Sequence, residues 1–251
     1  MFPEPDLRGP KITLGLAWAV AVGASLVVGP VLFALVLGTV AALAASQTAR
    51  TWRRARPPRA PLAPAALAAT AVVALGALLP TPGFVAVAVL AAIGAAAWAV
   101  SDAVHHGGWP APVDVLLTVA CAAVPAAAVA GPILLRRHGL ESALVLMAYA
   151  LVYDAGSWTM GSGSRHRWLG PLAGIACIGS VTIAVAAFAP QFRGNSPWEL
   201  GVLAAVLAPL GPPAASLVVG DRRVPVRALR RLDSLVLLGP IWAIAASRIG
   251  V

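Results

Sequence analysis

Charged residues are scarce in this 251-residue chain. They make up 11% of it, only nine residues are Asp or Glu, and the mean hydropathy is +0.88. A soluble domain of this length needs far more polar side chains to cover its surface. The composition therefore excludes a soluble globular protein and predicts an all-α polytopic membrane protein.

Cysteine is scarce as well. Cys121 and Cys177 lie in apolar runs, with no second cysteine at CxxC spacing and no histidine at metal-binding spacing. A disulfide framework and a cysteine metal site are thereby excluded, and both residues are predicted to be small core residues. There is no internal repeat and no polar segment large enough to fold alone. Residues 1–251 are therefore predicted to form a single membrane domain.

Apolar runs separated by Gly and Pro indicate the number of membrane crossings. A spanning helix needs about 20 apolar residues, with about 17 as the lower limit. Helix breakers stand at Gly29-Pro30, at Pro80-Thr81-Pro82-Gly83 and at Pro110-Ala111-Pro112, where helices are expected to end. We expect about nine transmembrane helices, at residues 12–28, 31–46, 63–79, 83–104, 113–135, 141–160, 168–189, 199–220 and 234–250.

Basic residues accumulate on one side of this topology. With nine crossings, 14 of the 18 Lys and Arg residues fall on the side of the N-terminus, and the other four are Arg136, Arg137, Arg193 and Arg248. Because Lys and Arg accumulate in cytoplasmic loops, we expect a cytoplasmic N-terminus and a multi-pass protein of the inner (cytoplasmic) membrane. The Arg136-Arg137 pair goes against this rule. Topology and anionic lipid headgroups account for the net charge of +9, so no nucleic-acid partner is expected.

Asp154 has the most costly position of any residue in the chain. It follows the apolar run Ser142–Tyr153 inside the sixth predicted span, where a carboxylate costs about 3 kcal/mol. Such a residue usually contacts an ion, a substrate or a partner side chain, and a hydrated Asp near a helix end is the alternative. Gly156, Gly161 and Gly163 follow it, and small residues there would let a ligand approach the backbone.

Two polar segments lie on the predicted cytoplasmic side. Residues 161–167, Gly-Ser-Gly-Ser-Arg-His-Arg, combine backbone donors, hydroxyls and basic groups that suit a phosphate. An ordinary loop is the alternative interpretation. The second segment, residues 211–233, carries five arginines between Arg222 and Arg231, followed by Asp233. It fits contact with an anionic lipid or with a substrate phosphate.

Three segments of the C-terminal half carry a resemblance to a known family. Residues 153–161 (Tyr-Asp-Ala-Gly-Ser-Trp-Thr-Met-Gly) are similar to a segment Asp-Thr-Gly-Ala-Tyr-x-x-Gly, and residues 166–174 (His-Arg-Trp-Leu-Gly-Pro-Leu-Ala-Gly) to Lys-Thr-Trp-Glu-Gly-x-x-Gly-Gly. Residues 230–235 (Arg-Arg-Leu-Asp-Ser-Leu), followed by Gly239-Pro240, resemble Asp-Arg-Ile-Asp-Ser-Leu and the helix after it. The family is that of the bacterial phosphatidate cytidylyltransferases (CDP-diacylglycerol synthases), whose membrane fold also has nine helices.

The three segments occur in the family's order and lie within residues 141–245. Residues 141–251, spans six to nine, therefore look like cytidylyltransferase helices, whereas the N-terminal helices, residues 1–135, match the family only in hydropathy. The resemblance implies that CTP and phosphatidic acid react to give CDP-diacylglycerol and pyrophosphate, with Mg²⁺ as cofactor. The partners would be CTP and membrane lipids, either phosphatidic acid or another anionic lipid. A homodimer is also compatible with the resemblance.

The resemblance also implies a site. It makes Asp154, Asp233 and Arg231 the catalytic residues. The residues it implies around the nucleotide are Gly156, Ser157, Gly161, Arg165 and Arg167. The metal would be held by Asp154, Asp221 and Asp233.

Two departures from the family's pattern affect the predicted metal site. Pro212 stands where the family has an aspartate, and Arg230 stands where it has an acidic residue. Proline has no side-chain ligand and arginine repels a cation, although arginine can bind phosphate itself. Asp221 would have to replace the missing carboxylate.

Three functions remain open from the sequence. The chain is an active cytidylyltransferase-like enzyme, an inactive relative that binds lipid, nucleotide or a partner protein, or a small transporter with Asp154 as its cation site. No paired inverted repeat supports the transporter. Of the other polar residues, His105 and His106 have the plainer interpretation of interfacial histidines, with a metal pair as the alternative. Asp114 and Glu141 suit helix N-termini.

Overall fold

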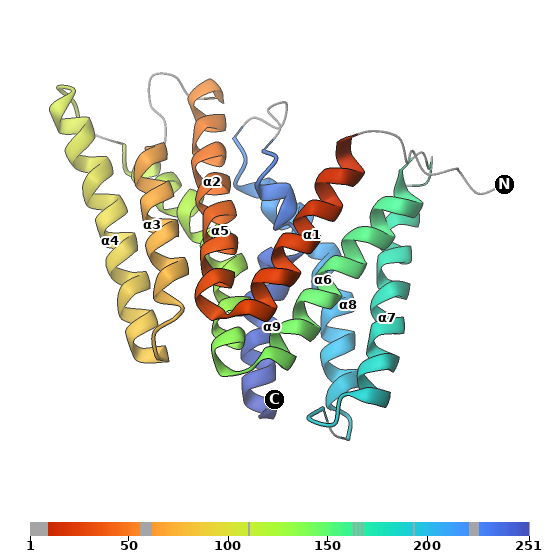
Figure 1. Cartoon of the computed structure of the whole chain (residues 1–251). Coiled ribbons are helices and arrows are strands. Elements are labelled where there is room, and N and C mark those ends of the chain that lie inside the picture. Colours follow the sequence, from red (N-terminus) through yellow and green to blue (C-terminus); the bar gives the residue numbers. More distant parts are fainter. Residues whose placement is uncertain are drawn as a thin grey trace.

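The computed structural model describes residues 10–55, 62–109, 111–162, 164, 166, 168–192, 194–220 and 226–250. All regular structure within these ranges is helical (Figure 1). The elements are α1 (Pro10–Val28), α2 (Pro30–Ala55), α3 (Ala63–Gly76), α4 (Thr81–His105), α5 (Pro112–His138), α6 (Leu140–Gly161), α7 (Leu169–Phe188), α8 (Ser196–Leu217), the 3-10 turn η1 (Leu229–Arg231) and α9 (Leu235–Ile249).

Successive helices alternate in direction, so α1 begins at the same end of the bundle as α3, α5, α7 and α9 (Figure 1). Six helices of the described chain are long and apolar enough to cross a membrane, namely α2 and α4 to α8. The apolar parts of α1, α3 and α9 are shorter, between 10 and 17 residues. The prediction of a polytopic, all-helical membrane protein is confirmed, and the number of nine crossings stays a prediction.

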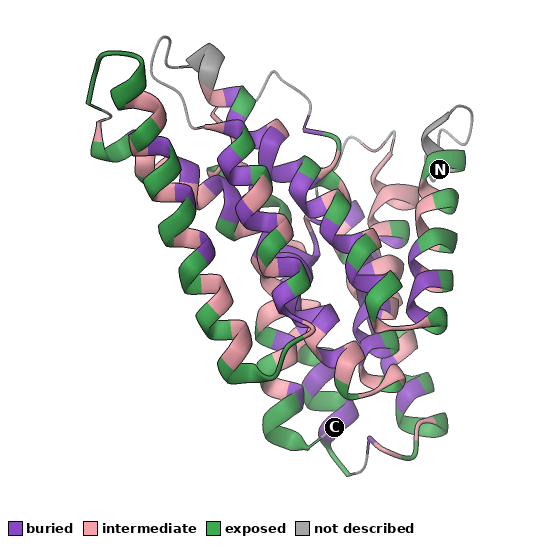
Figure 2. Ribbon diagram, turned by 60° about the vertical axis from the view of Figure 1, so that its left-hand side comes forward, coloured by how far each residue is buried: buried purple, intermediate pink, exposed green. Residues whose placement is uncertain are grey.

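The outer surface is apolar, as a bilayer requires. Large hydrophobic side chains are exposed along the outward faces of α1, α4, α7 and α8, among them Val20, Leu90, Ile183 and Val206. Figure 2 shows exposed residues along the outer helices and buried residues on the inner ones. In water so much exposed apolar area would cause aggregation, whereas acyl chains cover it without cost.

Glycine and proline together produce the crossing of α5 and α9. Pro132 has no N–H, so the carbonyl of Ala128, four residues earlier, lacks its helical donor. Gly239 of α9 lies directly against this carbonyl, since a Cβ added at Gly239 would come within 2.6 Å of the Ala128 oxygen. The reciprocal contact is as close: Gly131 lies against the Gly239 carbonyl. Small residues at these positions let the two helix backbones approach closely.

Polar side chains join four helices in the interior. The hydroxyl oxygens of Tyr149 (α6) and Thr182 (α7) lie 3.2 Å apart. Trp242 (α9) donates its indole N–H to the carbonyl of Leu200 (α8) at 3.2 Å. The rings of Tyr149 and Trp242 meet edge to face, with centroids 6.3 Å apart. Both aromatic side chains are fully buried, so Trp242 serves in packing.

A hydrogen bond to α1 explains why Arg136 lies on the side of the topology that has few basic residues. Pro30 has no N–H, so the Leu26 carbonyl at the end of α1 lacks its partner four residues on. Arg136, near the end of α5, donates Nε–H to this carbonyl at 2.6 Å. The guanidinium therefore caps α1 where a positive charge also suits the helix dipole.

Replacing Arg136 with methionine is expected to destabilise the fold because the Leu26 carbonyl loses its only donor. The loss of a hydrogen bond to a charged group costs about 2 kcal/mol, which lowers the Tm by roughly 5 °C in a chain of this size. The Tm in detergent measures it. Arg248→Met removes an exposed arginine from α9 and serves as the control, and equal Tm values for the two variants would contradict the capping role.

Candidate functional site

Asp154 on α6 meets the connection between α8 and α9. The hydroxyl of Ser234 donates a hydrogen bond to Asp154 Oδ2 at 3.2 Å. Asp233 and Arg231 also lie within electrostatic range of the Asp154 carboxylate. Ser234 is 1% exposed, so this contact is shielded from water. The three residues that the sequence singled out as catalytic, although up to 79 positions apart, are thus brought to one place.

The local sequence accounts for the shape of this connection. Leu229, Leu232 and Leu235 recur every third residue and are all buried. This period matches the 3-10 turn η1 and its continuation, in which the N–H of Leu232 bonds to the Leu229 carbonyl at 2.8 Å and that of Leu235 to Leu232 at 2.9 Å. The intervening charged residues are less buried than these leucines, whereas Ser234 is buried against α6. Of the charged residues, Arg230 is exposed, and Arg231 and Asp233 are partly buried.

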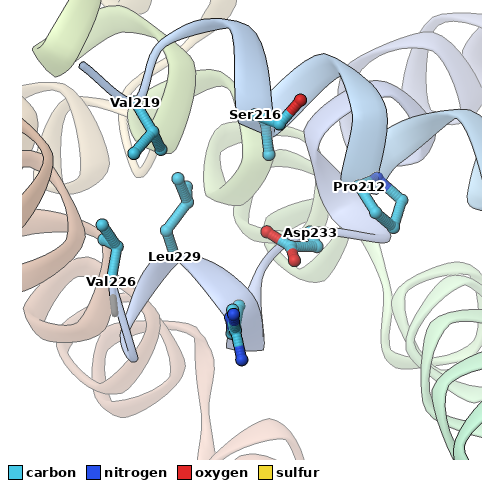
Figure 3. Close-up of a pocket in the computed structure, with 8 residues that line it drawn as sticks. Pro212, Ser216, Val219, Val226, Leu229 and Asp233 are labelled. Atoms are coloured by element: carbon cyan, nitrogen blue, oxygen red, sulfur yellow. The ribbon is translucent and has the colours of Figure 1, made fainter. Parts of the chain in front are cut away.

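A pocket of about 260 Å³ lies between α8 and this connection (Figure 3). Its polar lining comes from Ser216, Arg230 and Asp233, and its remaining lining residues are Pro212, Ala215, Val219, Val226 and Leu229. Glycine is required beside it, since Gly211 lies against the Asp233 carbonyl, and a Cβ there would be 3.1 Å from Ser234 Cα. The close approach places Pro212 and Asp233 on the same pocket.

The C-terminal part of α2 contacts residues on both sides of the pocket, at the end of α8 and just before η1. Trp52 donates its indole N–H to the Val218 carbonyl at 2.9 Å, and its ring packs on Gly220, where a Cβ would lie 2.6 Å from Cδ2 of the indole. The N–H of Gly220 bonds to the Thr51 hydroxyl at 2.9 Å. On the other side of the pocket, Gln47 Oε1 accepts from the N–H of Ala228 at 3.2 Å. These α2 residues are a part of the site that sequence reasoning missed.

Asp233 is electrostatically unusual. Burial raises the pKa of this carboxyl to about 6, and the nearby Arg230 guanidinium opposes the shift. The carboxylate is therefore negatively charged above about pH 6 and becomes neutral below it. At neutral pH the pocket thus contains a carboxylate and a guanidinium side by side.

The described residues that were predicted to bind the nucleotide lie elsewhere on α6. Gly156 packs on α7, where a Cβ would lie 2.7 Å from Cys177 Sγ, and Gly161 packs on Gly170, where it would lie 3.2 Å from the Cα. Ser157 donates to the Asp154 carbonyl at 3.2 Å. Both glycines thus serve helix packing, and their contact with a nucleotide stays a prediction. Three predicted residues lie outside the described chain: Arg165, Arg167 and Asp221.

Of the three predicted Mg²⁺ ligands the structure describes Asp154 and Asp233, whereas Asp221 lies outside the described residues, so the metal site stays a prediction. No group of three or more His, Cys, Asp or Glu side chains suited to a metal occurs among the described residues. Among the described residues that line the pocket, Asp233 alone has a carboxylate. Pro212 has no donor atom, and the Arg230 guanidinium repels a cation. Mg²⁺ requires a near-octahedral shell of oxygens.

Comparison with protein-family models, with curated proteins and with solved structures finds no match to this chain.

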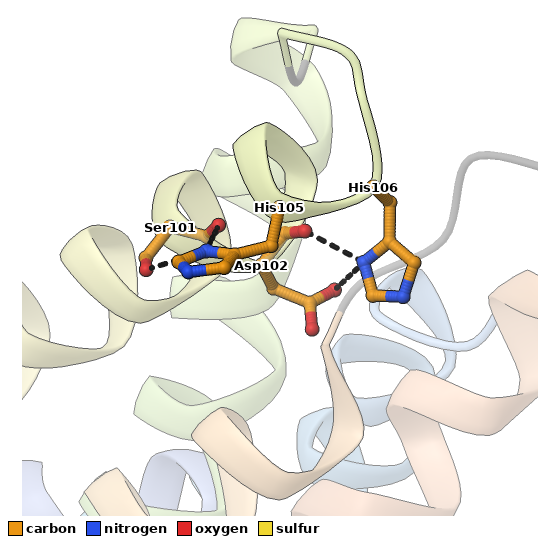
Figure 4. Close-up of polar contacts among 4 residues, drawn as sticks. All are labelled: Ser101, Asp102, His105 and His106. Atoms are coloured by element: carbon orange, nitrogen blue, oxygen red, sulfur yellow. Dashed lines mark hydrogen bonds and ion pairs between the residues drawn. The ribbon is translucent and has the colours of Figure 1, made fainter.

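The histidines at the end of α4 form a separate polar group (Figure 4). His105 bonds through Nδ1 to the Ser101 carbonyl at 2.7 Å, and His106 in the same way to the Asp102 carbonyl at 2.7 Å. His106 also lies 3.8 Å from the Asp102 carboxylate. Both rings therefore bond to the last turn of their own helix, and their position at the membrane interface stays a prediction.

Proposed function

We propose that this protein binds the phosphate headgroup of a membrane lipid at the site formed by Asp154, Ser234 and the arginines of the α8–α9 connection. The observation that carries the proposal is the hydrogen bond between Ser234 and Asp154. It holds a carboxylate of one helix against a connection that bears Arg230 and Arg231 and borders an open pocket. A costly intramembrane carboxylate with basic partners is expected to have a function.

The surroundings of the pocket suit a lipid. Apolar side chains line most of it, and Leu217 on the adjoining end of α8 is 77% exposed. Guanidinium groups bind phosphate through paired N–H donors. A headgroup could thus enter the pocket while its acyl chains stay among the exposed apolar side chains of the bundle.

The membrane and the orientation are part of the proposal. We place the protein in the inner (cytoplasmic) membrane, with nine crossings and a cytoplasmic N-terminus. The alternating helices bring the starts of α1 and α3 to the end of the bundle that holds the site (Figure 1). In the topology with nine crossings, 14 of the 18 basic residues belong to the cytoplasmic side, as the positive-inside rule favours.

Cytidylyl transfer to phosphatidic acid is the second candidate. It rests on the resemblance of the α6 and α8–α9 segments to phosphatidate cytidylyltransferases. One observation favours it, namely that Asp154 and Asp233 lie within electrostatic range of each other. The missing metal ligands count against it, and an inactive relative that keeps the lipid site agrees better with Pro212 and Arg230.

Lipid binding is tested by thermal unfolding of the purified protein in detergent with added phosphatidic acid or phosphatidylcholine. Phosphatidic acid at a hundred times its Kd is expected to stabilise by about 3 kcal/mol, which raises the Tm by roughly 5–10 °C. Phosphatidylcholine should have little effect. Arg231→Gln should lose most of the shift, while Arg248→Gln, at the other end of the bundle, should keep it.

A transfer assay distinguishes the two candidates. Labelled CTP and phosphatidic acid with Mg²⁺ are expected to give no CDP-diacylglycerol. Mg²⁺-dependent product that Asp154→Asn and Asp233→Asn both abolish would establish the enzyme instead. A protein that shows neither turnover nor a preference for phosphatidic acid would refute both candidates.

A further inference from the structure

The arginines of the site have donors available for an anion. Arg230 lines the pocket, and Arg231 extends toward α1, where a Cβ at Gly15 would lie 3.6 Å from its Nη1. Between described residues the only ion pair joins His106 and Asp102, so neither arginine is bound to a carboxylate there. Each guanidinium offers five N–H donors in a planar arrangement that matches phosphate oxygens.

Two positions on the pocket that could hold a cation have other side chains. Pro212 and Arg230 line the same pocket as Asp233. A carboxylate at either position would have joined Asp233 as a metal ligand, whereas proline supplies no ligand and arginine supplies a positive charge. The guanidinium therefore provides at this place the charge that a divalent cation would otherwise bring to a phosphate.

The charged side chains shown at the site are those of Arg230 and Asp233, which line the pocket, and of Arg231 and Asp154 beside it. The two guanidinium groups give a phosphate two cationic partners, and an added Mg²⁺ would face the positive charge of Arg230.

We infer that Arg230 and Arg231 bind a phosphate monoester directly, with no divalent cation between the protein and the phosphate. This inference rests on the proposed function and adds the class of ligand and the mode of its recognition. Phosphatidic acid exposes such a monoester at the membrane surface, and inorganic phosphate carries the same group in solution. The disagreement between this chain and the metal-dependent family it resembles is thereby explained as a change in how phosphate is held.

The test measures binding of short-chain dioctanoyl phosphatidic acid to the full chain in detergent by isothermal titration calorimetry, with either EDTA or Mg²⁺. The Kd is expected to agree within about twofold in the two buffers, because no cation takes part in the site. The double variant Arg230→Gln, Arg231→Gln should bind about tenfold or more weakly through the loss of charge-assisted hydrogen bonds. Arg248→Gln is the matched control and should keep the wild-type Kd.

The possible outcomes test the metal-free binding mode separately from the proposed lipid binding. Binding that EDTA removes and Mg²⁺ restores would overturn the inference and leave the lipid site in place. No preference for phosphatidic acid over phosphatidylcholine in either buffer would overturn the lipid site itself. Competition by millimolar inorganic phosphate would support arginine recognition of a soluble phosphate, and its absence would support the lipid headgroup.

Discussion

Replacing Gly131 with valine is expected to abolish folding. The glycine lies at the crossing of α5 and α9, where an added Cβ would overlap the Gly239 carbonyl and come within 3.0 Å of Pro240 N. These neighbours are backbone atoms, so no rotamer change can relieve the overlap. Overpacking of side chains costs about 1–3 kcal/mol. Separating two helix backbones costs more, on the order of 5 kcal/mol, which is comparable to the whole stability of many domains.

The measurement is the yield of monodisperse protein after extraction into detergent and size exclusion. Gly131→Val should give little or none, and Gly131→Ala, which adds the same overlapping Cβ, should also give a low yield with a lower Tm. Gly179→Val is the matched control, because Gly179 is an exposed glycine of α7 with no heavy atom near the position of a Cβ. A wild-type yield from Gly131→Val would show that α5 and α9 do not cross at this point.

Helix boundaries at proline and glycine were predictable from the sequence because these residues act locally, whereas α2 runs to Ala55, well past the predicted end of the second span at residue 46. The break at Gly29-Pro30 separates α1 from α2, and Pro112 begins α5 as expected. The predicted third span, 63–79, was too long at its end. α3 stops at Gly76, where residues 77–79 form a turn before Pro80. The hydropathy stays high through this turn, because it measures only the transfer of side chains to the membrane. It carries no information on the hydrogen bonding of the backbone.

The site was predictable only in part, because contacts between residues far apart in the sequence form it. The cost of a buried carboxylate singled out Asp154, and the resemblance connected it with Asp233, whose neighbour Ser234 donates to it. Nothing in the sequence linked Trp52 with Val218, because their contact joins segments 166 positions apart. The contact of Gly211 with Asp233 is also tertiary, and it brings Pro212 into the pocket. The roles of these residues in binding stay predictions.

Replacing Pro212 and Arg230 together with aspartate is expected to create a divalent-cation site. Both residues line the pocket beside Asp233, so the double variant would present three carboxylates to one space. Asp at position 212 is also tolerated by the helix, since it restores a backbone N–H that proline lacks. The substitutions remove one positive and add two negative charges, which favours a cation over a phosphate.

Mn²⁺ binding followed by electron paramagnetic resonance measures the gain. The double variant should bind one Mn²⁺ with a Kd near 10⁻⁴ M, the range of weaker all-oxygen sites, and the unchanged protein should bind none at that concentration. The control Pro213→Asp with Arg227→Asp makes the same change of charge at neighbouring residues that do not line the pocket. Equal Mn²⁺ binding by the control would attribute the effect to general surface charge. Selective binding by the Pro212 and Arg230 variant, with phosphate binding that now depends on the cation, would mean that two side chains decide how this pocket holds a phosphate.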